Sequence, residues 1–95
     1  MNMHANDLNY GMRADEARLN ITWAGQNGDL KDPVPYGATD AMIREWATEA
    51  IASGGVVGIR ADADAKLTGF VVDRFPATDK TPYHRMFLRP ETPFG

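Results

Sequence analysis

Few side chains in this sequence have the types and spacing that chemistry requires. His4 and His84 lie far apart in the sequence, and neither has a cysteine or a carboxylate at ligand spacing, so they do not indicate a metal site. Asp62 and Asp64 alternate in a short acidic segment, but the glycine and the distal glutamate of a calcium-binding loop are missing. We therefore expect His84 to be a partly buried strand residue with its ring nitrogen satisfied, and the two aspartates to lie in a solvated turn.

Nucleophilic and nucleotide-binding chemistry has no support either. The chain has no cysteine and no Ser/His/Asp arrangement, and Gly54, Gly55 and Gly58 lack the lysine and the spacing of a phosphate-binding loop. Trp23 and Trp46 could form a stacking platform, but their periodicity assigns both to the core faces of their elements. We expect no enzyme activity and no cofactor.

The elements that position these side chains must fit in one small domain. The sequence has 95 residues, of which 43% are hydrophobic and 24% charged, with a formal net charge of −3. This composition is typical of a folded globular domain. Acidic and basic residues are mixed and form no basic stripe, which argues against a nucleic-acid partner. No stretch approaches a membrane span or a signal peptide, so we expect a cytoplasmic protein with no membrane partner.

Two kinds of periodicity define the elements. Residues 1–17 are polar and aperiodic, which predicts a flexible arm, and Leu19 to Trp23 then alternate as a half-buried strand does. The segment Gly25-Gln26-Asn27-Gly28-Asp29 follows, and its Asn27-Gly28 pair predicts a hairpin turn there. The segment after the turn, Leu30 to Tyr36, contains Pro33 and Pro35. The two prolines remove backbone donors from one side of this segment, which predicts an edge strand.

The second half of the chain predicts a helix and two more strands. Apolar residues from Ile43 to Ile51 recur at helical spacing between a cap at Thr39 or Asp40 and the stop Gly54-Gly55. A long connection is expected over residues 56–69, with Ile59 as its anchor. Residues 70–75 and 83–89 predict strands. In the last strand we expect one face, with His84, Met86 and Leu88, to be buried. We expect the other face to be exposed; it carries Tyr83, Arg85, Phe87 and Arg89. The prolines of residues 90–95 predict an extended tail.

This order of elements resembles a β-grasp, and the chain looks like a ubiquitin-like protein of the bacterial modifier type. Local features support the resemblance: Ala38-Thr39-Asp40 opens the helix, Gly58-Ile59 follows it, and Leu88-Arg89 ends the last strand before a tail to Gly95. The resemblance implies an α+β fold in which a four- to five-stranded mixed sheet, over residues 18–89, wraps one helix. Residues 1–17 and 90–95 would flank this domain.

The resemblance also implies a function. A ubiquitin-like modifier is activated at its C-terminal glycine, here Gly95, by an activating enzyme, and is then joined to target lysines with a conjugating enzyme. A residue without a side chain suits this chemistry, because its carboxylate must pass a narrow channel and present an unhindered carbonyl. The preceding Phe94, where ubiquitin has a second glycine, would need a matching pocket in a dedicated enzyme; otherwise the tail is not conjugated.

A second surface follows from the same resemblance. Matching Leu88-Arg89 to the Leu-Arg of ubiquitin assigns Phe87, Arg85 and Arg89 to the solvent face of the sheet, with Val72 or Val71 on the neighbouring strand. An exposed phenylalanine between arginines is typical of an interface hot spot. The alternatives to a modifier are therefore a non-covalent interaction module that uses this face or the tail, and a sulfur carrier with a C-terminal thiocarboxylate.

Overall fold

The alternating segment forms a long central strand, β1 (Glu16–Trp23). The structure, a computed structural model, describes residues 12–91; Phe94, Gly95 and most of the predicted arm lie outside this range. Within it, Met12 and Ala17 are fully buried. The sheet includes residues before the predicted boundary at residue 18, because Glu16 and Ala17 already pair with the short strand β3 (Val34–Pro35).

The hairpin turn after β1 lies at Ala24 and Gly25, which have φ values of 53° and 75°. The hairpin predicted for residues 25–29 is confirmed, but its tight turn does not use Asn27-Gly28, since both residues belong to β2 (Gln26–Leu30). Gly28 has a different role there, since a Cβ atom at this position would lie 1.8 Å from the carbonyl oxygen of Val57. The glycine allows the backbone of β4 (Val56–Val57) to pack closely against β2.

The sheet of the described residues has six strands in the order β4-β2-β1-β6-β5, with β3 also paired to β1. Strand β6 (His84–Arg89) runs parallel to β1, and β5 (Val71–Phe75) is antiparallel to β6. Six strands exceed the expected four to five because two-residue segments add to the sheet, and β4 lies in the region predicted as a connection. The edge position predicted for the proline-containing arm is confirmed for β3, whose one strand neighbour among residues 12–91 is β1.

The helix α2 (Asp40–Ser53) forms as predicted. Thr39 is its N-cap, with a side-chain oxygen that accepts a hydrogen bond from the Met42 backbone N–H at 3.1 Å. Gly54 ends it in the left-handed conformation at φ 76°. The predicted apolar stripe faces the core through Ile43, Ala47 and Ile51, all fully buried.

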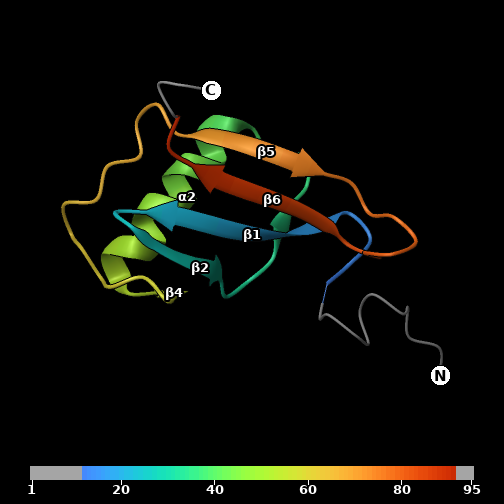
Figure 1. Cartoon of the computed structure of the whole chain (residues 1–95), viewed down its shortest axis with the longest axis horizontal. Coiled ribbons are helices and arrows are strands. Elements are labelled where there is room, and N and C mark those ends of the chain that lie inside the picture. The colour runs from blue at the N-terminus through green and yellow to red at the C-terminus, as the bar shows by residue number, and fades with distance from the viewer. Residues whose placement is uncertain (1–11, 92–95) are drawn as a thin grey trace.

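The helix covers one face of the sheet, so that in Figure 1 it lies behind the strands. Between them lies the core, to which the sheet contributes Leu19, Ile21, Met86 and Leu88 and the segment after β4 contributes Ile59, Ala65 and Leu67. Met86 and Leu88 confirm the buried face predicted for the last strand. Trp23 and Trp46 pack against this core but are only half-buried.

Arg74 of β5 forms hydrogen bonds with the connection between β3 and α2. Its guanidinium donates hydrogen bonds to the carbonyl oxygens of Tyr36 at 2.7 Å and Ala38 at 2.8 Å. It also forms an ion pair of 2.6 Å with Asp40 in the first turn of the helix. These contacts join one end of the helix to the outer strand of the sheet.

No helix in residues 12–91 is long and apolar enough to cross a membrane.

Candidate protein-interaction surface

The register of β5 and β6 determines which side chains share the face of the sheet that lies away from the helix. Arg85 lies opposite Phe75, Phe87 opposite Asp73, and Arg89 opposite Val71. Directly opposed residues of an antiparallel pair point to the same side. Arg85, Phe87 and Arg89 therefore share the face predicted for them, but all three are half-buried there and not fully exposed.

Val72 does not belong to this surface, and its predicted place there is wrong. It lies opposite Leu88 and packs against the core. The physical reason is the two-residue period of a strand: Val71, Asp73 and Phe75 share the open face, so Val72 must point to the helix side. Of the two valines that sequence reasoning left open, Val71 is the one on the open face.

Phe75, Arg85 and Phe87 form one cluster, which we call the aromatic face. The two rings meet edge to face, with centroids 5.4 Å apart and planes at 79°. The guanidinium carbon of Arg85 lies 5.4 Å from the Phe75 centroid and 5.8 Å from the Phe87 centroid. Both distances are within the range of cation–π attraction. Phe75 remains 44% exposed although it is a large apolar side chain.

The aromatic face holds Arg85 in a defined position and leaves one of its nitrogen atoms without a hydrogen-bond partner in the described part of the chain. Its Nε atom is buried and has no hydrogen-bond partner among residues 12–91. A donor of this kind gains free energy when an acceptor reaches it. Together, two contacting aromatic rings and an ordered arginine have the composition typical of a binding hot spot.

Next to the aromatic face, Arg89 is paired with Asp73. The Arg89 Nε atom lies 2.6 Å from one carboxylate oxygen of Asp73, and Nη2 lies 3.5 Å from the other. The side-chain hydrogen bond and then the charge of Asp73 raise the pKa of Arg89 above its ordinary value. The guanidinium therefore stays charged at every physiological pH, and its charge is already compensated.

The other half of the open face is polar and bonded to itself. Asn20 donates to the side-chain oxygens of Asn27 at 3.0 Å and Asp29 at 2.8 Å. Asn27 donates in return to Asn20 and to Thr22, both at 2.8 Å. Because these amides already have partners, this half has less to offer a binding protein than the aromatic face has.

His84, the histidine within the described residues, has a structural role, as predicted. Its ring stacks on Tyr36 with centroids 4.2 Å apart, and its Nδ1 atom accepts a hydrogen bond of 2.9 Å from the Ala77 backbone N–H. The turn predicted at Asp62 is also present, since Asp62 accepts a hydrogen bond from the Asp64 backbone N–H at 2.8 Å. Over residues 12–91, no three His, Asp or Glu side chains are grouped to hold a metal ion.

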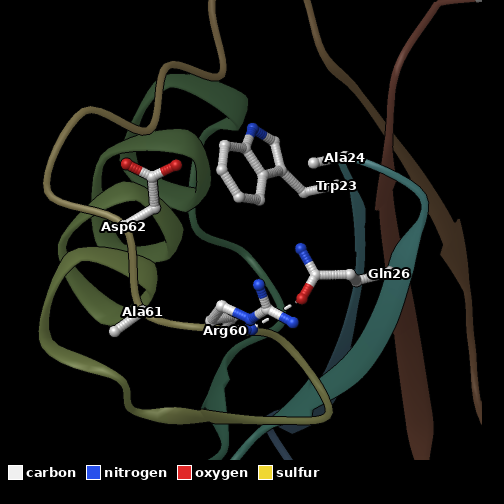
Figure 2. A pocket seen from close by; sticks show the side chains of 6 residues that line it. All are labelled: Trp23, Ala24, Gln26, Arg60, Ala61 and Asp62. Carbon is white, nitrogen blue, oxygen red and sulfur yellow. Dashed lines mark hydrogen bonds between the residues drawn. The ribbon is translucent and has the colours of Figure 1, made fainter.

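A hollow of about 370 Å³ opens beside the hairpin turn, with Trp23 on one wall and the segment after β4 on the other (Figure 2). Gln26 spans its floor, where its side-chain oxygen accepts a hydrogen bond of 2.7 Å from the Arg60 backbone N–H. The remaining lining residues are Ala24, Ala61 and Asp62. The hydrogen bond between Gln26 and Arg60 holds the connection predicted after the helix against the hairpin.

Sequence reasoning found Phe87, Arg85 and Arg89 but missed Phe75 and Asp73. The signal was available, since Phe75 follows Asp73 by two residues in a segment already predicted as a strand.

No known protein family, no curated protein and no solved structure matches this chain.

Proposed function

We propose that this chain is a protein-interaction module of the β-grasp, ubiquitin-like type, and that a partner protein docks on the aromatic face. The observation that supports this function best is the cluster of exposed Phe75 with half-buried Phe87 and Arg85, which lies on the sheet face away from the helix. Burying the exposed part of the two rings would release ordered water from apolar surface. Arg85 would supply the directional contact.

Charge further narrows the partner's chemistry. The protein carries a net charge of −3, yet Arg85 brings a positive charge to the two rings of this face. Arg89 is compensated by Asp73 and adds little net charge to the patch. A complementary surface therefore presents apolar side chains to the rings and an acidic side chain or a carbonyl oxygen to Arg85.

Site-specific crosslinking followed by affinity measurement tests this proposal. A photoreactive phenylalanine at position 75 or 87 should crosslink a defined partner in cells, whereas the same group at Val57 should not. Val57 is the matched control, because it is 75% exposed and lies at the opposite edge of the same face, across from Asp29. With the crosslinked partner purified, Phe87→Ala should weaken binding by about 1–2 kcal/mol or more, as is typical of a hot-spot residue.

Two results would contradict the proposal. One is an unchanged affinity of Phe87→Ala and of Phe75→Ala in variants whose amide spectra show an intact fold. The other is a loss of affinity in Val57→Ala that equals the loss in Phe87→Ala, because the binding energy would then be spread over the face or lie at its other edge.

A second function, conjugation through Gly95, is supported by the topology. The first and last long strands, β1 and β6, are parallel neighbours in the middle of the sheet, and a single helix packs on one face. A β-grasp has this arrangement, and the chain leaves β6 at Arg89, six residues before Gly95. We therefore keep the ubiquitin-like modifier, with activating and conjugating enzymes and target lysines as partners, as the second proposal. A sulfur carrier would use the same activation.

Incubation with a candidate activating enzyme and ATP tests the second function. Mass spectrometry should find Gly95 joined to an enzyme thiol or to a lysine amine, and deletion of Gly95 should abolish the adduct without changing the unfolding midpoint. The absence of any adduct with activating enzymes from the same genome would refute conjugation. Binding of the aromatic face to its partner would be unaffected by that result.

A further inference from the structure

Among residues 12–91, the backbone groups that β5 directs away from β6 have no backbone partner. β5 is the last strand in the sheet order, and its one strand neighbour within residues 12–91 is β6 (Figure 1). Since alternate residues of a strand direct their N–H and C=O groups to opposite sides, some of the five residues of β5 must direct theirs away from β6. In the same range, no turn or loop forms a backbone hydrogen bond with Val71–Phe75.

This edge lacks the features that protect the other edges of the same sheet. β3 carries Pro35 and follows Pro33, and β4 is only two residues long. β5 has neither a proline nor a lysine within its five residues. Its one cationic side chain, Arg74, is turned toward the helix connection, where it contacts two carbonyl groups and Asp40. An edge strand of this length without a proline can accept a further strand through its free backbone groups.

The side chains along β5 define what a neighbouring strand must present. Val71, Asp73 and Phe75 alternate on the open face, so a strand paired with β5 would place three of its own side chains beside them. The Asp73 side chain is 38% exposed. Arg89 already pairs with Asp73 from the β6 side, but its Nη2 atom lies 3.5 Å from the second carboxylate oxygen, so that oxygen can accept a further cation. A lysine or arginine is therefore favoured beside Asp73, with apolar residues beside Val71 and Phe75.

A second copy of this chain fits the edge poorly. An antiparallel pair of β5 strands that used all five residues would centre on Asp73 and oppose it to its own equivalent. Like charges directly opposite each other destabilise a strand pair. The edge therefore favours a different chain with a complementary sequence.

We propose that β5 is a strand-addition site for an extended segment of a partner protein in which a lysine or arginine alternates with apolar residues. The segment adds a further strand to the sheet at β5 and lies next to Phe75, so it borders the aromatic face. The inference does not rest on docking at the aromatic face, because backbone pairing requires only the free edge.

A designed peptide and backbone NMR test the inference on the full chain. The probe is acetyl-Thr-Val-Thr-Lys-Thr-Val-Thr-amide, whose lysine and valines match the alternation of β5. At saturating peptide, amide shifts should concentrate in residues 71–75, and the amides of β5 that point away from β6 should exchange their hydrogens at least about tenfold more slowly.

Three peptide variants make the test specific. N-methylation of one of the two alternating sets of peptide amides should abolish binding, whereas methylation of the other set should not, because only one edge of the peptide faces β5. Replacement of the lysine by glutamate should weaken binding at least about twofold, as one cross-strand charge pair predicts. Phe87→Ala should leave the peptide's effect on the β5 amides unchanged, which separates this site from the aromatic face.

Several outcomes would overturn the inference. These are an absence of shifts at millimolar peptide, shifts centred on β1 and β6 with residues 71–75 unchanged, and equal tolerance of both methylation patterns. If the amide shifts of residues 71–75 changed with protein concentration in the absence of peptide, the strand that adds at β5 would be a second copy of this chain and not a partner protein.

Discussion

Replacing Gly28 with alanine is expected to force β4 away from β2. The added Cβ atom would lie 1.8 Å from the carbonyl oxygen of Val57 and 3.1 Å from a side-chain methyl group of Val56. The first distance is far inside van der Waals contact, and its partner is backbone, which cannot rotate away as a side chain can. The close approach continues just after β4, where a Cβ atom at Gly58 would lie 2.4 Å from the carbonyl oxygen of Asn27. Both backbones must therefore separate.

The expected loss in the free energy of unfolding follows from the contacts that β2 and β4 lose when they separate. Val56 is almost fully buried, and exposure of a valine side chain costs about 1.5–3 kcal/mol. Each backbone hydrogen bond lost between β2 and β4 adds about 0.5–1.5 kcal/mol. Partial relaxation lowers the sum, so we expect Gly28→Ala to reduce the free energy of unfolding by about 2–4 kcal/mol.

Urea denaturation with the matched variant Gly37→Ala measures this effect. A Cβ atom at Gly37 meets no atom within 4 Å, and Gly37 does not have a positive φ. That variant should be neutral or up to about 1 kcal/mol more stable, because alanine restricts the unfolded chain. The close approach of β2 and β4 would be refuted if Gly28→Ala and Gly37→Ala unfolded at about the same urea concentration.

Three further substitutions probe other local features of the fold by the same denaturation assay. Ala24→Gly should stabilise the protein by up to about 1 kcal/mol, because Ala24 has a φ of 53° in the hairpin turn; a destabilised variant would contradict the turn geometry. Thr39→Ala should cost about 1 kcal/mol through loss of the helix cap, and Thr39→Ser should restore most of it. Arg74→Ala should cost about 2 kcal/mol by leaving two carbonyl groups without their donor. Arg44→Ala is its control, since Arg44 donates one hydrogen bond of 3.2 Å to a single carbonyl group; an equal loss in both variants would mean that the Arg74 contacts add nothing specific.

The aromatic face and the edge of β5 give the sheet two adjoining surfaces of different chemistry. Phe75 belongs to both, because it contacts Phe87 and Arg85 and also ends the free edge strand. A partner that added a strand at β5 could continue over the rings, which would enlarge the buried area. Such a partner would lose affinity both through Phe87→Ala and through N-methylation of its own backbone.

The sequence alone determined the elements whose signals are local. Thr39 and Gly54 define the ends of α2 through their own cap geometry, and the helical spacing from Ile43 to Ile51 assigned its buried face. Alternation likewise separated Met86 and Leu88 from Arg85 and Phe87 on the last strand. Caps and periodicity depend on neighbours within a few residues, so they are visible before the chain is folded.

Only the tertiary structure decided the features that depend on pairing between distant segments. The tight contact with Val57 explains why Gly28 lies in a strand, while Ala24 and Gly25 form the turn. The register between β5 and β6 assigned Val72 to the core and brought Phe75 to Phe87 and Arg85. A shift of one residue in that register would have exchanged the two faces of β5, and no local signal in the sequence fixes such a register. The aromatic face therefore became visible only when the two strands were paired.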